Sequence, residues 1–357
     1  MSERIKEIDN LHITGYEELP SPGQLKDELP LKGKALESVL AGHRQVKAIL
    51  DRTDSRLIVV VGPCSIHNSE EARDYALRLK PLADKLKDSL CIVMRVYFEK
   101  PRTSVGWEGL IYDPYLDGTH RIEHGLRTGR RLMLDIAEIG LPIAVEALDL
   151  ISPQYLQDLV TWTAIGARTT ESPTHRKLAS GISSAVGFKN NVDGSLSVAV
   201  NAIRSASANN SFISITEQGK VAVFRTDGNP HCHVILRGGK APNYDAASVA
   251  ACEEELRKAA LKENIMIDCS HGNSQKDFRK QADVLDAVAD QIVSGNRSII
   301  GVMMESNLEE GNQPIPDDLD EIRYGVSITD SCLNWQTTEK LLTDFSDKIV
   351  SSLRERS

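Results

Sequence analysis

Eight short apolar segments of the sequence each end in a residue whose side chain could take part in chemistry. The closing residues are Cys64, Arg95, Glu146, Arg168, Lys189, Arg237, His271 and Glu305. One polar residue after a strand means little, because strands often emerge into water there. Eight in succession, several of them where a turn would usually place Gly, Asn or Asp, favour one shared site.

The basic members of this set form a cationic group within an acidic protein. They are Arg95, Lys100, Arg168, Lys189 and Arg237, with Arg102 nearby, whereas the whole chain has 42 Lys and Arg against 51 Asp and Glu, a formal net charge of −9. Cations that only pair with surface acids would lie on helix faces, but these lie at strand ends and in the loop 99–104. Arg binds carboxylate or phosphate oxygens bidentately and Lys adds a point charge, so we expect a small polyanion such as a phosphorylated carboxylate.

A second group combines a thiol, an imidazole and two carboxyl groups. Its members are Cys64, His271, Glu305 and, further along the chain, Asp330. Such a mixed set can hold a divalent transition-metal ion and leave one position for a substrate oxygen. The four residues match no short metal-binding motif, and a lone buried Cys is more often a core residue. The prediction therefore depends on a fold that brings their segments together.

The elements that would do this are short strands alternating with helices. The apolar runs are residues 57–64, 90–98, 141–148, 163–168, 185–190, 233–239, 265–271 and 298–305, and most are separated by segments of helical period. This pattern predicts an α/β fold, a (β/α)8 TIM barrel over residues 55–357, with a doubly wound sheet as the alternative. Residues 1–54 form an N-terminal extension, and residues 212–228 predict an inserted β-hairpin.

Composition excludes several other classes of protein. The negative net charge argues against nucleic-acid binding. The longest apolar run, residues 57–61, is too short to span a membrane, and the polar N-terminus does not resemble a signal peptide. The six cysteines are scattered without close pairs, which favours reduced thiols, so we expect a cytoplasmic protein.

Several longer motifs resemble the type I 3-deoxy-D-arabino-heptulosonate 7-phosphate (DAHP) synthases. They are GPCSIH (62–67), MRVYFEKPRTSVGWEGL (94–110), GARTTES (166–172), AVGFKN (185–190), HVILRGGKAPNY (233–244), IDCSHGNS (267–274), ESNLEEGNQ (305–313) and YGVSITDSC (324–332). The resemblance implies a barrel enzyme, usually a homotetramer built as a dimer of dimers. It would join phosphoenolpyruvate to erythrose 4-phosphate with release of phosphate, the first step of the shikimate pathway.

The resemblance also implies a role for each matching residue. Phosphoenolpyruvate would be bound by Arg95, Lys100, Glu146, Ala167, Arg168, Lys189, Arg237 and His271. Erythrose 4-phosphate would be bound by Arg102, Thr103 and Asp330, and the metal by Cys64, His271, Glu305 and Asp330. Lys100, Cys64 and His271 would be the catalytic residues. Mn²⁺ is the expected ion, although Fe²⁺, Co²⁺ or Zn²⁺ would also suit these ligands.

The expected reaction is attack by C3 of phosphoenolpyruvate on an aldehyde whose oxygen is polarised by the metal. Water then adds at C2, and the C–O bond to phosphate breaks. Either Lys100 or a water held by the metal would protonate the new alkoxide. Other interpretations are a Schiff-base aldolase that uses Lys189, another metal-dependent aldolase or hydrolase, and a non-catalytic anion-binding barrel. The nearest enzyme alternative is 3-deoxy-D-manno-octulosonate 8-phosphate synthase.

Members of the family are commonly inhibited by one aromatic amino acid. The resemblance implies an effector site made of Asp9, Asn10, Ile151, Pro153, Leu178, Ile182, Ser183, Phe212 and Ser214. Ile151 offers no hydrogen bond to a phenolic hydroxyl, and an unsatisfied hydroxyl costs about 1–3 kcal/mol. We therefore expect phenylalanine as the effector, with a tyrosine-inhibited enzyme as the alternative.

Overall fold

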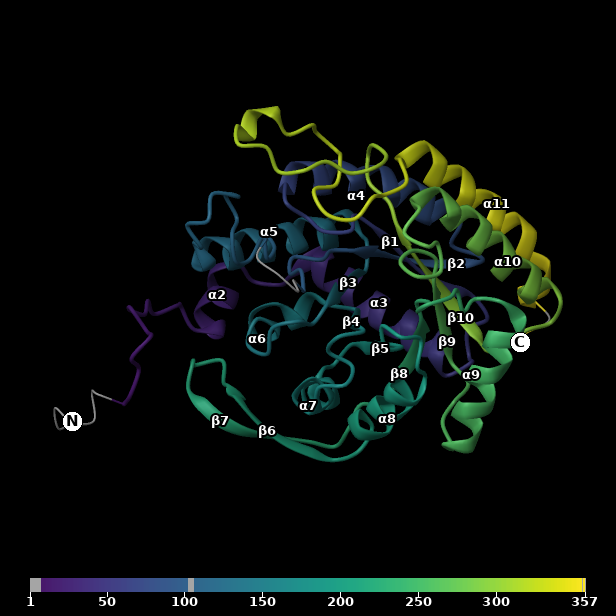
Figure 1. The fold of residues 1–357 in the computed structure, drawn as a ribbon, viewed down its shortest axis with the longest axis horizontal. Coiled ribbons are helices and arrows are strands. Elements are labelled where there is room, and N and C mark those ends of the chain that lie inside the picture. The colour runs from purple at the N-terminus through teal and green to yellow at the C-terminus, as the bar shows by residue number, and fades with distance from the viewer. Residues whose placement is uncertain (1–7, 102–105, 355, 357) are drawn as a thin grey trace.

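Eight parallel strands close into a barrel in this computed structural model, which describes residues 8–101, 106–354 and 356 (Figure 1). The strands are β1 (Leu57–Gly62), β2 (Leu90–Arg95), β3 (Ile143–Glu146), β4 (Trp162–Ile165), β5 (Ala185–Lys189), β8 (Cys232–Leu236), β9 (Ile265–Asp268) and β10 (Ile299–Glu305). Adjacent strands pair in chain order, and β10 pairs with β1 to close the ring. The predicted (β/α)8 barrel is therefore confirmed.

Helices surround this barrel on the outside. They are α4 (Ser69–Lys85), α5 (Ile122–Ile139), α6 (Pro153–Leu156), α7 (Pro173–Gly181), α8 (Ser197–Ala206), α9 (Ala246–Lys258), α10 (Gln281–Val293) and α11 (Trp335–Arg354). Short 3₁₀ turns lie at Gln157–Leu159, Phe278–Lys280 and Leu319–Glu321. The strands are apolar on both faces because one face meets these helices and the other fills the barrel interior.

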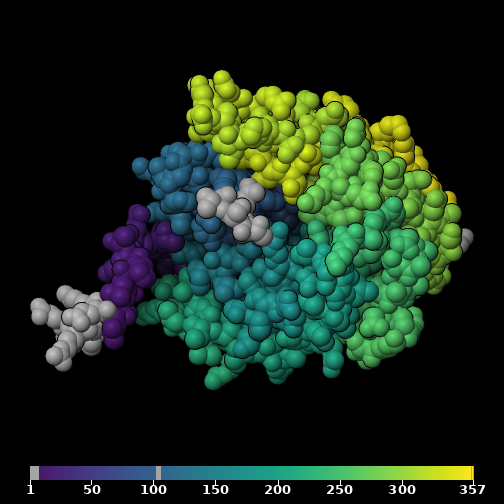
Figure 2. Space-filling model, in the orientation of Figure 1, coloured from purple at the N-terminus to yellow at the C-terminus, as the bar shows by residue number. Residues whose placement is uncertain are grey.

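The N-terminal part of the chain adds α2 (Pro22–Glu28) and α3 (Gly33–Leu50) before the first strand. Helix α3 buries Val46, Ile49 and Leu50 in the same apolar cluster as the inward-facing Ile58 and Val60 of β1. This helix therefore packs at the end of the barrel where the strands begin. Residues 8–19 are exposed or nearly so and stand clear of the rounded barrel (Figure 2).

The segment outside the barrel alternation is an antiparallel hairpin of β6 (Asn210–Ile215) and β7 (Val221–Thr226). Phe212 pairs with Phe224, and the two rings stack at 5.8 Å between centroids. Ile213 and Val223 face outward and are 75% and 64% exposed. The predicted hairpin is therefore present, two residues earlier than expected at each end. None of the helices that the structure describes is long and apolar enough to cross a membrane.

One buried carboxyl group ties together two loops at the carboxyl ends of the strands. Glu99, only 4% exposed, follows β2 and accepts a hydrogen bond from the Ser152 hydroxyl at 2.6 Å. It also accepts from the backbone N–H groups of Leu148 (3.2 Å) and Asp149 (3.1 Å), which follow β3. Burial is the main cause that raises the pKa of Glu99 to about 7.

This shift gives the free energy of unfolding a dependence on pH. The folded chain holds the Glu99 proton more tightly than the unfolded chain, so the stability from this group falls as pH rises from 4.5, its ordinary pKa, to about 7. Glu99→Gln keeps an acceptor but cannot ionise. We expect the variant to lose less stability than the parent between about pH 5 and about pH 8, by roughly 3 kcal/mol at most.

Urea unfolding followed by circular dichroism at the two pH values measures this difference. The same substitution at the exposed Glu108 is the control and should leave the pH dependence unchanged. If the free energy of unfolding declines equally in Glu99→Gln and in the parent protein, Glu99 is already ionised in the folded state at about pH 5, and its pKa is not raised.

Candidate active site

Three of the predicted metal ligands converge at the mouth of the barrel, where the strands end. The ligand atoms of Cys64, Glu305 and Asp330 all lie within 4.8 Å of one another. Strand pairing explains the first two, because Gly62 of β1 is in register with Glu305 of β10 and Cys64 follows two residues later. Asp330 comes from the loop between β10 and α11. The closed barrel thus brings together residues that are far apart in the sequence.

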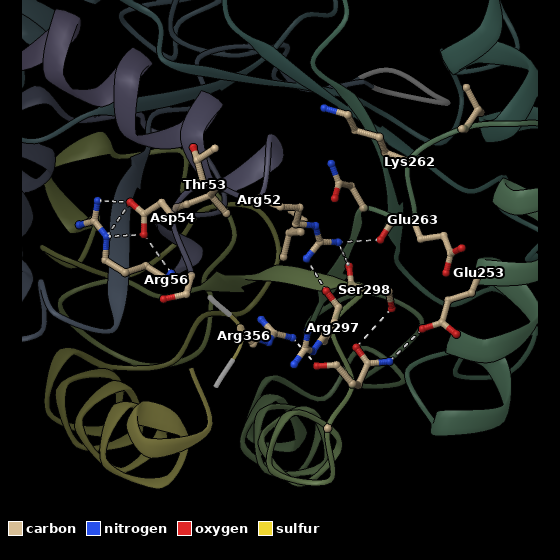
Figure 3. A pocket seen from close by; sticks show the side chains of 17 residues that line it. Arg52, Thr53, Asp54, Arg56, Glu253, Lys262, Glu263, Arg297, Ser298 and Arg356 are labelled. Carbon is tan, nitrogen blue, oxygen red and sulfur yellow. Dashed lines mark hydrogen bonds and ion pairs between the residues drawn. The ribbon is translucent and has the colours of Figure 1, made fainter. Parts of the chain in front are cut away.

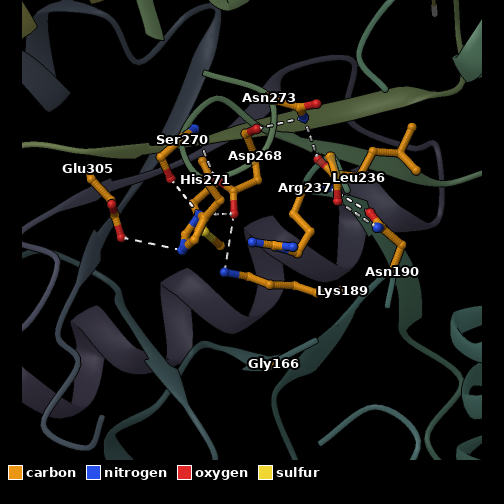
Figure 4. Close-up of polar contacts among 12 residues, drawn as sticks. Gly166, Lys189, Asn190, Leu236, Arg237, Asp268, Ser270, His271, Asn273 and Glu305 are labelled. Atoms are coloured by element: carbon orange, nitrogen blue, oxygen red, sulfur yellow. Dashed lines mark hydrogen bonds and ion pairs between the residues drawn. The ribbon is translucent and has the colours of Figure 1, made fainter. Parts of the chain in front are cut away.

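His271, the fourth predicted ligand, lies beside this cluster. Its Nε2 atom is 3.8 Å from Glu305 Oε1. Its Nδ1 atom contacts Asp268 Oδ2 at 2.9 Å and Ser270 Oγ at 2.7 Å, so the ring presents Nε2 to the cluster (Figure 4). A carboxylate behind a histidine is the arrangement that orients metal-binding imidazoles. The backbone of His271 is left-handed, with φ of +57°, a conformation few residues other than Gly adopt.

The charges around the cluster favour a cation there. Burial and the carboxylate of Glu305 raise the pKa of the Cys64 thiol. Lys100 opposes this rise, because its Nζ lies 3.1 Å from Cys64 Sγ. Burial also disfavours ionisation of Asp330, but Lys100, His271 and Arg95 outweigh it and hold the pKa of Asp330 below its usual value. A soft thiol and two carboxylates with an adjacent imidazole fit a divalent transition-metal ion, which would stabilise the thiolate.

Arg95 is the last residue of β2 and is almost fully buried beneath the cluster. Its Nη2 donates to Glu305 Oε1 at 2.9 Å, and its Nε donates to the carbonyl of Pro63 at 2.9 Å. The guanidinium also lies 3.7 Å from the centroid of the Tyr97 ring. Arg95 therefore fixes the orientation of Glu305 and adds positive charge at the base of the site.

Lys189 and Arg237 form the second part of the mouth. The side chains of Lys189, Arg237 and His271 point into the same space in Figure 4. Lys189 ends β5, and its Nζ is 3.2 Å from Asp268 Oδ2. Arg237 follows β8, where Asn190 accepts a hydrogen bond from its backbone N–H at 2.8 Å. This pair of cations offers charge for an anion beside the metal-ligand cluster.

The remaining predicted residues for phosphoenolpyruvate lie on β3 and after β4. Glu146 ends β3, and its Oε1 would be 2.2 Å from a Cβ atom built on Gly166, so Gly166 is needed for the present position of Glu146. Ala167 is half-buried and Arg168 is exposed. Arg102 and Thr103, predicted to bind erythrose 4-phosphate, lie outside the described residues.

The predicted effector residues fall into two groups. Ile151, Pro153, Leu178, Ile182, Ser183, Phe212 and Ser214 lie where α6, α7 and the hairpin meet. Gln154 Nε2 donates to Ser214 Oγ at 3.4 Å, and a Cβ atom on Gly181 would lie 3.5 Å from the Phe212 ring. Asp9 and Asn10, by contrast, are exposed on the N-terminal segment, which leads away from the barrel (Figure 1). A single chain does not bring these two residues into a common site with the others.

Sequence reasoning missed three polar residues that support this mouth. Asp268 is fully buried, and although burial opposes its ionisation, His271 and Lys189 hold its pKa well below the usual value. Asn190 orders the turn after β8, and Glu99 precedes Lys100. Each is a polar residue at or just after a buried strand. The sequence signal for these three residues is therefore the same as for the residue that closes each apolar run: a polar side chain at the carboxyl end of a buried strand.

Comparisons with known proteins identify the family of this chain. The profile of the DAHP synthetase I family matches residues 36–343. The Tyr-sensitive phospho-2-dehydro-3-deoxyheptonate aldolase of Escherichia coli (strain K12) is 52% identical over 349 residues, which cover 98% of each chain. The Phe-sensitive protein of that strain is 51% identical over 341 residues, covering 96% of this chain and 97% of that protein.

A solved structure shows the same architecture. The phospho-2-dehydro-3-deoxyheptonate aldolase of Francisella tularensis SCHU S4 superimposes with a TM-score of 0.92 and 44% sequence identity, and the match covers 97% of this chain and 99% of that one. The predicted enzyme class, a DAHP synthase and hence a transferase, is confirmed. The chain belongs to the DAHP synthetase I family.

Proposed function

We propose that this enzyme condenses phosphoenolpyruvate with erythrose 4-phosphate to give DAHP and phosphate, the first step of the shikimate pathway. One observation carries the proposal: the cluster of Cys64, Glu305 and Asp330 lies at the same barrel mouth as the cations Lys189 and Arg237. The cations suit an anionic substrate, and the cluster suits an ion that acts on a carbonyl. We place the enzyme in the cytoplasm, where thiols such as Cys64 stay reduced.

The chain's own residues would hold the substrates in place. Lys189, Arg237 and Arg168 offer charge to the carboxylate and phosphate of phosphoenolpyruvate, and Arg102 and Thr103 remain proposed contacts of the sugar phosphate. Holding two reactants in a reactive geometry can contribute about 7–11 kcal/mol toward lowering a barrier. Lys100, whose Nζ lies 3.1 Å from Cys64 Sγ, is placed to deliver a proton to an oxygen at the cluster.

Cys64, His271, Glu305 and Asp330 would hold a divalent ion, for which we propose Mn²⁺. When bound, such an ion acts as a Lewis acid that polarises a carbonyl oxygen. Asp268 supports this assignment because its contact with His271 Nδ1 leaves Nε2 for a metal. Asp268 also contacts Lys189, and this ion pair occupies the amine that a Schiff base would need, which argues against the aldolase alternative.

Removal of the metal should abolish condensation. We expect enzyme stripped with a chelator to lose its activity and to regain it with Mn²⁺, as measured by the disappearance of phosphoenolpyruvate absorbance with erythrose 4-phosphate. Cys64→Ser should lower both the rate and the affinity for Mn²⁺ by at least about 100-fold. Cys252→Ser is the matched control, because Cys252 is an equally buried thiol on α9.

Two results would contradict these assignments. Full activity in metal-free enzyme would show that the ion is not needed for catalysis. The proposed substrates would still stand. Faster turnover with arabinose 5-phosphate than with erythrose 4-phosphate would instead assign the chain to 3-deoxy-D-manno-octulosonate 8-phosphate synthesis.

We further propose inhibition by an aromatic amino acid bound where α6, α7 and the hairpin meet. The two E. coli relatives carry Tyr-sensitive and Phe-sensitive in their names at nearly equal identity, so the choice rests on the residues. Ile151 is 36% exposed and apolar, which favours phenylalanine.

We also propose a homotetramer, a dimer of dimers. Large apolar side chains are exposed on the N-terminal segment and the hairpin at Ile8, Leu11, Ile13, Tyr16, Leu19, Ile213, Val221 and Val223. Exposed apolar patches of this kind mark contact surfaces. A neighbouring chain in the assembly would supply Asp9 and Asn10 to the effector site, because a single chain leaves them exposed.

Inhibition titrations test the choice of effector. We expect phenylalanine to inhibit about tenfold more strongly than tyrosine, since an unsatisfied hydroxyl costs about 1–3 kcal/mol. Ile151→Ser should narrow this difference by offering a hydrogen-bond partner. The same truncation at Leu77, an exposed residue on α4, should leave it unchanged. Stronger inhibition by tyrosine in the parent enzyme would reverse the assignment.

A further inference from the structure

Asp330 differs from the other members of the metal-ligand cluster in how the fold places it. Glu305 ends β10, and Cys64 follows β1 by two residues, so strand pairing positions both. Asp330 instead lies near the end of the long loop between β10 and α11, residues 306–334, in which the structure shows one short 3₁₀ turn, Leu319–Glu321. Contacts made by side chains must therefore bring this loop to the cluster.

The cluster itself does not favour the close approach of Asp330. Its carboxylate lies with that of Glu305 and with Cys64 Sγ inside a space of 4.8 Å, and like charges at such distances repel. A bound ion would draw the ligands together. The free energy needed to order a loop at that moment would be lost from the affinity for the ion, so an ordered loop binds it more tightly.

One hydrogen bond joins the residues directly beside two of the ligands. Ser65 follows Cys64, Thr329 precedes Asp330, and the two hydroxyl oxygens lie 2.7 Å apart. Ser65 is 1% exposed and Thr329 is half-buried, so this bond is largely removed from water. The backbone N–H of Thr329 also donates to the Ser327 hydroxyl at 3.1 Å. The segment of Cys64 and the loop of Asp330 are therefore linked side chain to side chain.

Asn312 ties Thr329 and Asp330 into one unit. Its Nδ2 donates to the carbonyl of Thr329 at 3.0 Å, and its Oδ1 accepts from the Ser331 hydroxyl at 2.8 Å. These contacts lie on the two sides of Asp330. One residue further along, the backbone of Cys332 pairs with that of Gly311. A bond that fixes Thr329 therefore also fixes the backbone from which the Asp330 carboxylate extends.

We propose that Ser65 and Thr329 are positioning residues of the metal site, whose shared hydrogen bond holds Asp330 at a ligand's distance from Cys64 before the ion binds. This inference rests on the metal assignment proposed above and adds two residues outside the ligand set. Supporting contacts of this kind set how well a site fits its ion. The alternative is that the bond contributes to folding stability alone.

Titration of the metal-free full chain with Mn²⁺, followed by electron paramagnetic resonance without substrates, separates these roles. Ser65→Ala and Thr329→Val each remove one hydroxyl. We expect each to weaken Mn²⁺ binding about tenfold, the lower end of the range for residues that support metal ligands. Thr329→Ser keeps the hydroxyl and should restore the affinity. The double variant should lose no more than either single variant, because the two hydroxyls form one bond.

Ser298→Ala is the matched control. Ser298 is also a buried serine, 5% exposed, and its hydroxyl donates to Asn296 Oδ1 at 3.2 Å. It lines a pocket at the opposite end of the barrel, where the strands begin (Figure 3). We expect this variant to lose stability in urea, as Ser65→Ala does, and to keep the Mn²⁺ affinity of the parent. Thr329→Val carries the test if Ser65→Ala fails to fold.

Equal Mn²⁺ affinities in the parent, Ser65→Ala and Thr329→Val, with weakened binding in Cys64→Ser, would overturn this inference and leave the metal assignment standing. Binding in Thr329→Ser as weak as in Thr329→Val would also overturn it, because the loss would then come from packing. A parent enzyme that binds no Mn²⁺ would overturn the metal assignment and this inference together.

Discussion

The charged side chains that end four of the barrel strands are almost removed from water, so they must neutralise one another. The Arg95–Glu305 pair has side chains that are 1% and 2% exposed, and Asp268, which faces Lys189 and His271, is fully buried. Removing one partner of such a buried pair costs about 3–5 kcal/mol, because the other charge is left uncompensated. The site is therefore a fixed arrangement of charges before any substrate arrives, and this suits an enzyme that must align anionic reactants.

Strand pairing, more than loop conformation, sets this arrangement. Arg95, Lys189, Asp268 and Glu305 are each the last residue of a barrel strand, and the register of β1 with β10 places Gly62 beside Glu305. A one-residue slip would reverse the direction of each side chain. Carboxylates face two of these strand-end cations, since Arg95 pairs with Glu305 and Lys189 with Asp268.

The sequence was sufficient to predict the barrel, because near-continuous apolar runs between helical segments have few other solutions. It also predicted the convergence of Cys64, Glu305 and Asp330, since closure of the barrel makes the ends of β1 and β10 neighbours. It could not predict which polar residues would lie behind the site. In the sequence, Asp268 is a single acidic residue next to a cysteine. Only the fold shows that it contacts His271 and Lys189. The packing of α3 against the barrel interior was also missed, because an amphipathic helix does not specify its partner.

The buried Glu99 offers a physical link between the proposed effector site and the mouth. It immediately precedes Lys100, and it accepts hydrogen bonds from Ser152 and from the backbone of Asp149, on either side of Ile151. A bound effector that displaced this loop would break one or more of these bonds, and each buried group left unsatisfied costs about 1–3 kcal/mol. Coupling energies between sites in proteins are typically of the same size. A small shift of the loop would therefore be enough to move Glu99, and with it the backbone that positions Lys100 against Cys64.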